Sequence, residues 1–156
     1  MPYSAIEIAV AFVKKAISES KYVTQMKLQK LVYFAHGYHL AKTGDPLIKD
    51  EVQAWDFGPV IPSIYHAFKL YGSDPIIDLK YAMLPDGCKN VILDANAQDA
   101  VDFTWNALKE VGAIKLSAWT HQDDTPWKKA YRQNIRDIVI DNKEIGKYFH
   151  EFLQKA

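Results

Sequence analysis

Apolar residues recur every three or four positions along much of the chain, a spacing that predicts amphipathic helices. The first such stretch follows Ser4 and the second follows Thr24, and both residues are favoured helix caps. Glu7 stands three residues after Ser4 and completes a capping box. Helices are therefore predicted from residue 5 to about 17 and over residues 25–42, where a following Gly-Asp-Pro sequence gives a stop signal.

The middle of the chain predicts less regular structure. Residues 47–55 alternate apolar and polar positions toward their end, which favours a short strand. Gly58-Pro59 is expected to open a third helix over residues 60–70, because proline suits the first turn of a helix. Residues 91–93 are short and β-prone.

Helix signals return in the C-terminal half of the chain. One helix is expected over residues 97–112, and a short one capped by Ser117 is expected to run to His121. Another is expected to begin after Thr125 and continue to Arg132, and a last one is expected to be capped by Asp141. The whole pattern predicts a mainly α protein. We expect a single compact domain over residues 1–156, built from five to six helices with one or two short β segments.

Composition and charge narrow the class of protein. The 156 residues are 49% hydrophobic and 24% charged, which is typical of a globular domain and not of a disordered chain. Nineteen basic residues balance nineteen acidic residues, so the formal net charge at pH 7 is zero. Proteins that bind nucleic acid normally carry a basic surplus, and we therefore do not expect nucleic acid as a partner.

Cysteine content and hydropathy predict the compartment. The one cysteine, Cys88, can form neither an internal disulfide nor a cysteine-based zinc site, which favours a reducing environment. No apolar run has the length of a membrane span, and the first residues do not have the pattern of a signal peptide. We expect a cytoplasmic protein that does not associate with a membrane.

Histidines supply one alternative chemistry. His36 and His39 share a face of the second helix, and Asp56 and His66 follow further along the chain. No HExxH spacing or cysteine partner accompanies them, so a half-buried helical His39 and a surface His36 explain the pattern more simply. A metal-dependent enzyme that uses these residues or His121 is the weakest alternative. We expect no enzyme, no metal and no cofactor.

The second helix supplies another alternative. The segment Thr24–Lys30 follows a short break after the first helix, as a recognition helix does in a helix-turn-helix. Lys27 and Lys30 would then contact phosphate groups. The alternative function is a small DNA-binding regulator that uses this helix, although two lysines are also typical of a solvated helix face.

The most unusual segment is residues 53–60, where two large aromatic residues flank an acid before a Gly-Pro turn. A structural interpretation places Trp55 in the core at a strand-to-helix corner. A functional interpretation makes the segment a binding surface, because rigid aromatic side chains are effective anchors at protein interfaces. The candidate partner-binding residues are Trp55, Asp56, Phe57, Gly58, Pro59, Tyr65, His66 and Lys69.

Three separated motifs resemble those of one known family. Residues 27–35, KLQKLVYFA, resemble its "LQKLLYFA" signature, and residues 54–60, AWDFGPV, resemble its "AW-x-x-GPV" element, which precedes a helix with a tyrosine, here Tyr65. Residues 116–121, LSAWTH, with Pro126-Trp127, resemble its "LS-x-x-TH … PW" element. Because the motifs occur in the same order, the chain is identified as a member of this family, the Panacea-domain family.

The resemblance implies a non-enzymatic role. Panacea-domain proteins are antitoxins of bacterial and phage toxin–antitoxin pairs, and they are similar to the SocA-type adaptor that delivers its toxin to a ClpXP protease. It implies that this protein binds a cognate toxin encoded by an adjacent gene and either masks that toxin or delivers it to a ClpXP-type protease. Exposed aromatic residues are also compatible with a homodimer. Leu28, Leu31, Phe34 and Trp127 suit a role in the core.

Overall fold

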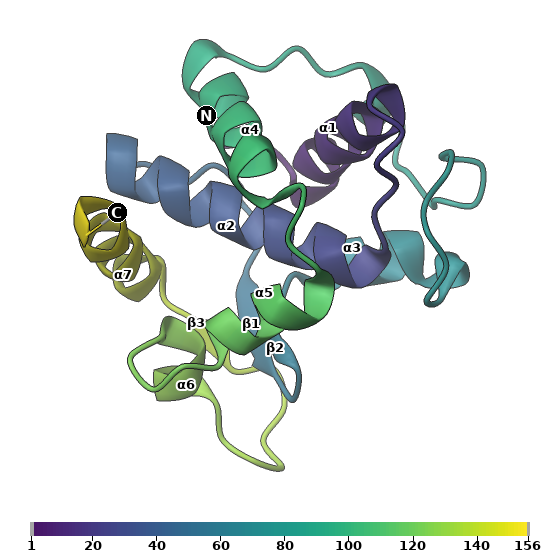
Figure 1. Cartoon of the computed structure of the whole chain (residues 1–156). Coiled ribbons are helices and arrows are strands. Elements are labelled where there is room, and N and C mark those ends of the chain that lie inside the picture. The colour runs from purple at the N-terminus through teal and green to yellow at the C-terminus, as the bar shows by residue number, and fades with distance from the viewer. Residues whose placement is uncertain (1, 156) are drawn as a thin grey trace.

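The structure is a computed structural model that describes residues 2–155. Over these residues it forms seven α-helices and a three-stranded antiparallel sheet of order β2-β1-β3 (Figure 1). The helices are α1 (Ala5–Ser18), α2 (Gln25–Thr43), α3 (Pro62–Phe68), α4 (Ala95–Leu108), α5 (Ala113–Thr120), α6 (Pro126–Ala130) and α7 (Asn142–Lys155). The strands are β1 (Val52–Trp55), β2 (Gly58–Val60) and β3 (Val139–Ile140), and two 3-10 turns are η1 (Lys69–Tyr71) and η2 (Cys88–Asn90).

The mainly α prediction is confirmed, with two differences in number. Residues 2–155 form seven α-helices where five to six were expected, and three strands where one or two were expected. None of these helices combines the length and the apolar composition that a bilayer-spanning segment needs.

Local capping signals predicted most helix starts correctly. Ser4 and Glu7 form the expected capping box at the start of α1. The side chain of Thr24 accepts a hydrogen bond from the Lys27 amide at the start of α2, and Thr125 caps α6 in the same way. α4 begins at Ala95, two residues earlier than predicted, because the side chain of Asp94 caps it.

The prediction of a helix from residue 60 onward is wrong at its start. Gly58–Val60 is strand β2, and it pairs with β1 so that Ala54 faces Pro59. The Ala54 amide donates to the Ile138 carbonyl on the opposite side of β1, so this pair needs no amide from β2 and tolerates a proline. Helix α3 then begins at Pro62, which occupies the first turn.

Two further local predictions are wrong. Ser117 does not cap a helix, because α5 already begins at Ala113 and places Ser117 in its middle. Residues 91–93 join no strand, and Ile92 is 91% exposed.

Helix α2 lies at the centre of the molecule. It packs against α1, α4, α5, α7 and β2, and Figure 1 shows α4 crossing it and α7 beside its C-terminal part. Leu28 and Leu31 are fully buried, as predicted, while Phe34 is only partly buried. A helix that is surrounded in this way buries residues around its whole circumference, polar residues included.

α2 and α7 approach closely at a glycine. The ring of Phe149 on α7 meets Tyr33 and Phe34 on α2 edge-on, with centroid separations of 5.6 and 5.4 Å. A Cβ atom built on Gly37 would overlap the Phe149 ring. Gly37 therefore permits the contact between the two helices.

Replacing Gly37 by alanine should destabilise the fold. We expect Gly37→Ala to lower the free energy of unfolding by about 1–3 kcal/mol, because the overlap forces α7 away from α2. Gly146→Ala on α7 is the matched control, since its Cβ would lie 3.5 Å from the Leu40 Cβ in ordinary contact. That variant should gain about 0.5–1 kcal/mol from helix propensity. Urea denaturation measures both, and a Gly37→Ala protein as stable as wild type would contradict the packing.

Candidate partner-binding site

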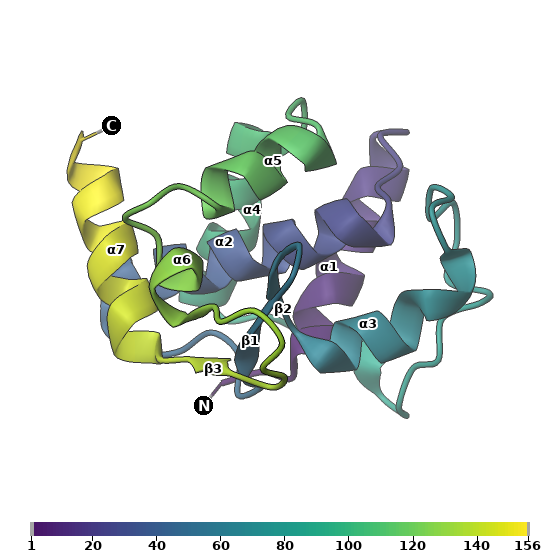
Figure 2. The same ribbon diagram turned by 90° about the horizontal axis from the view of Figure 1, so that it is seen from below.

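The β1–β2 hairpin carries the centre of the predicted binding segment. Trp55 pairs with Gly58, and Asp56 and Phe57 form the turn between them. Figure 2 shows the hairpin crossing the face of α2, between α6 and α3 in that view. Gly58 has a φ of +119°, a backbone conformation that residues other than glycine rarely adopt.

Side chains from three helices hold the hairpin carbonyls. The Lys30 ammonium donates to the carbonyls of Phe57 and Pro59, both at 3.3 Å. The Ser117 hydroxyl of α5 also donates to the Phe57 carbonyl, at 3.1 Å. The indole nitrogen of Trp127 in α6 donates to the Trp55 carbonyl at 2.7 Å. Three alternate carbonyls around the turn are therefore fixed by distant parts of the chain.

An aromatic stack supports the other side of the turn. The centroid of the Trp127 ring is 4.0 Å from that of His121 and 4.7 Å from that of Tyr131. The Trp127 and Tyr131 rings are nearly parallel. The Tyr131 hydroxyl donates to the Asp56 carboxylate at 2.6 Å, and this bond raises the pKa of Tyr131. The stack thus connects the turn to α5 and α6.

Lys30 is a buried cation beneath the hairpin. Only 2% of the residue is exposed, and burial lowers the pKa of its amine from 10.5 to about 8. A Cβ atom on Gly58 would lie 2.7 Å from Lys30 Nζ and 3.1 Å from Thr120 Oγ1. Glycine at position 58 is therefore required both for its backbone conformation and for the space that Lys30 occupies.

The predicted residues divide into a surface group and a supporting pair. Phe57 is 79% exposed at the tip of the hairpin, and Asp56, His66 and Lys69 are exposed as well. Trp55 is half-buried and meets the ring of Tyr65, which is 41% exposed, at 5.4 Å. Gly58 and Pro59 are buried and lie behind this surface.

The supporting residues were not among the predicted site residues. Lys30, Ser117 and Trp127 lie within the three motifs, but no local pattern shows that they converge on one hairpin. The core role predicted for Trp127 is confirmed, as it is 5% exposed. Tyr131 lies outside the motifs, and no sequence signal identified it.

His36 and His39, two of the candidate metal ligands, are engaged within the fold, while His66 is exposed. His36 is fully buried under α7, so its predicted surface position is wrong. Its Nε2 pairs with Asn142 Oδ1 at 2.9 Å, and burial lowers the pKa of His36 to about 4. His39 Nδ1 donates to the Asp45 carbonyl. Within residues 2–155 no group of three His, Cys, Asp or Glu side chains is arranged to hold a metal ion.

The helix proposed for DNA binding is also engaged internally. Lys30 is buried, and Lys27 is half-buried with its amine donating to the Lys109 carbonyl at 2.7 Å. Other elements surround α2. The segment Thr24–Lys30 therefore does not present its lysines to phosphate groups as a recognition helix does.

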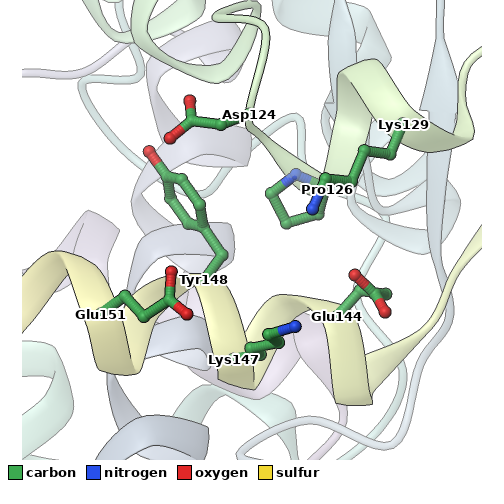
Figure 3. A pocket seen from close by; sticks show the side chains of 7 residues that line it. All are labelled: Asp124, Pro126, Lys129, Glu144, Lys147, Tyr148 and Glu151. Carbon is green, nitrogen blue, oxygen red and sulfur yellow. The ribbon is translucent and has the colours of Figure 1, made fainter.

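A small depression between α6 and α7 has about 80 Å³ of space. Its lining residues are Asp124, Pro126, Lys129, Glu144, Lys147, Tyr148 and Glu151 (Figure 3). Three carboxylates and two amines surround it, so its charges are mixed, and its volume is small for a ligand site.

Comparison with known proteins places the chain in a family. Residues 28–128 match the family model described as antitoxin SocA-like, Panacea domain, and the chain belongs to this family. Antitoxin SocA of Caulobacter vibrioides (strain NA1000 / CB15N) is 33% identical over 125 residues. The match covers 77% of this chain and 66% of that protein, slightly less than two thirds of its length. No solved structure matches the chain significantly.

The matched region contains most of the hairpin support. Lys30, the hairpin itself, Ser117 and Trp127 all lie within residues 28–128, while Tyr131 lies just beyond them. The region that matches the family therefore contains the hairpin and three of the four side chains that hold it.

The buried amine gives the hairpin support a measurable pH signature. Between pH 8 and pH 10.5 the unfolded chain binds more protons at Lys30 than the folded chain does. The free energy of unfolding therefore rises with pH over this range, because the cost of burying the charged amine is lost. We expect the unfolding free energy of wild type, relative to Lys30→Met, to increase by about 2 kcal/mol from pH 7 to pH 9.5.

Lys42→Met is the control, because Lys42 is an exposed lysine near the other end of α2. In denaturation experiments, the difference in unfolding free energy between wild type and Lys42→Met should stay constant over the same pH range. A constant difference for Lys30→Met would show that the amine is not buried beneath the hairpin.

Proposed function

We propose that this protein is an antitoxin that neutralises a cognate toxin by direct binding, with the hairpin tip and the adjacent face of α3 as the contact surface. The observation that carries this proposal is the 79% exposure of Phe57 on a hairpin whose carbonyls are held by three helices. Membership of the antitoxin SocA-like family supports the same role.

The rigidity of the hairpin favours tight binding. Ordering a loop at an interface costs free energy, and the hydrogen bonds to the hairpin carbonyls reduce that cost. Aromatic side chains, phenylalanine included, are enriched at the cores of protein interfaces. Trp55, Tyr65 and His66 extend the aromatic surface beside the hairpin tip.

The second motif contains both residues exposed at the hairpin tip and buried residues that support it. In the AW-x-x-GPV element, the two open positions correspond to Asp56 and Phe57, which form the turn. The defined positions include Gly58 and Pro59, which are buried. Within this element, the residues that support the hairpin and the residues exposed at its tip are therefore different ones.

The proposed role is non-catalytic and needs no cofactor. Binding alone neutralises a toxin when the antitoxin covers the toxin's active surface. The same complex also allows delivery of the toxin to a ClpXP-type protease. These two mechanisms share the contact surface and differ in the fate of the toxin.

Co-expression with the product of each adjacent gene tests the proposal. A cognate toxin should stop growth alone, be harmless with this protein, and co-purify with it. Repeating the growth assay in cells without ClpX separates the mechanisms, because neutralisation by covering persists and neutralisation by delivery is lost. If no neighbouring product is toxic or co-purifies, the proposed function is wrong.

Removing the ring of Phe57 should weaken the complex. Phe57→Ala should raise the Kd for the toxin by at least tenfold, because a central hot spot contributes about 2 kcal/mol or more. Ile92→Ala is the matched control, since Ile92 is 91% exposed but lies in the segment before α4. Isothermal titration measures both affinities, and circular dichroism checks that both variants are folded. Equal affinities for the two variants would remove Phe57 from the interface.

A further inference from the structure

Positive charge is concentrated beside the hairpin. The two arginines of the chain, Arg132 and Arg136, both lie in the loop between α6 and β3. Together with Lys128 and Lys129 they place four cations within residues 128–138, against one acidic residue, Asp137. The zero net charge of the whole chain conceals this local surplus.

These cations are exposed and have no ion-pair partner in the described part of the chain. All four residues are exposed. The ion pairs found over residues 2–155 join Lys15 to Asp102, Lys21 to Glu110 and Lys109 to Glu19, and none includes the four cations. The Arg132 guanidinium donates to the carbonyls of Lys129 and Tyr131 through one nitrogen, which leaves its other N–H groups free.

The loop is held against the hairpin at both ends. Tyr131 donates to Asp56 at its start, and the Ile138 carbonyl accepts from the Ala54 amide, at 2.8 Å, at its end. Asn134 and Asp137 adopt φ values of +65° and +60°, which short polar side chains tolerate. In Figure 1 the hairpin lies below α5, and the loop between α6 and β3 extends further down, below the hairpin and α6. The loop therefore has a defined shape and continues the hairpin surface.

The loop also carries an apolar residue among its cations. Ile135 is 57% exposed and lies between Arg132 and Arg136 in sequence. An apolar residue surrounded by arginines resembles the anatomy of protein interfaces, where arginine is enriched and charge surrounds an apolar centre. Arginine also pairs with carboxylates through two parallel hydrogen bonds, which lysine does not.

We propose that Lys128 on α6, loop 131–138 and the hairpin tip form one docking surface for an acidic face of the toxin. Phe57 and Ile135 fill apolar pockets of the toxin, and Lys128, Arg132 and Arg136 pair with its carboxylates. This inference rests on the proposed function and adds the chemistry of the partner. The free cations and the continuity of the loop with the hairpin support it.

Binding kinetics distinguish the role of the charges from that of the apolar anchors. Charges at the rim of an interface steer association, whereas a buried anchor slows dissociation. The double variant Lys128→Gln/Arg136→Gln removes two cations and leaves Arg132, which organises the loop. Its association rate with the toxin at low salt should fall about tenfold, and the salt dependence of that rate should weaken.

Lys42→Gln/Lys147→Gln is the matched control. It removes the same net charge at two exposed lysines, one on α2 and one on α7, that lie outside residues 128–138. Its association rate should remain within about twofold of wild type. A zero-length carbodiimide crosslink between Lys128 and a carboxylate of the toxin, mapped by mass spectrometry, would support the same orientation.

Each outcome of this comparison decides the inference. Equal rates for both double variants, or association of wild type that does not depend on salt, overturn the acidic docking surface and leave the proposed function intact. The absence of any toxin complex with wild type overturns both. A salt-sensitive gel shift with DNA that is lost only in Lys128→Gln/Arg136→Gln, with toxin kinetics unchanged, would assign the loop to nucleic acid and contradict the inference.

Discussion

The contact between the Lys30 ammonium and two hairpin carbonyls connects the centre of this protein to its candidate binding surface. Lys30 lies on α2, the helix against which most other elements pack, and its amine contacts the hairpin at Phe57 and Pro59. A buried ammonium without a carboxylate is costly, and the depressed pKa of Lys30 reflects that cost. The carbonyl dipoles offset part of it, and the two hydrogen bonds attach the hairpin to the core.

Residues from all three motifs meet at one hairpin in this chain. Lys30 belongs to the first motif, Gly58 and Pro59 to the second, and Ser117 and Trp127 to the third, and all of them meet at the hairpin. A residue pattern spread over the length of the chain thus specifies a single support. The side chain most exposed at that support, Phe57, occupies a position that the motif leaves open.

Overall charge and local charge give different information about the partner. A balanced chain argues against a general polyanion binder, because nucleic acid requires an extended basic surface. The cluster at residues 128–136 adjoins an aromatic tip, and such a mixture of cations and apolar anchors fits a protein surface with carboxylates around an apolar pocket.

The sequence alone determined the features that depend on near neighbours. The caps at Ser4, Thr24 and Thr125 and the end of α2 at Gly44 involve hydrogen bonds or backbone angles within a few residues, so local patterns predict them. Only the tertiary structure decided that residues 58–60 form a strand, that His36 is buried, and that Lys30 and Ser117 hold one hairpin. The side chains of Lys30, Ser117 and His36 bind partners 27, 60 and 106 residues away, and local periodicity contains no information about contacts at such separations.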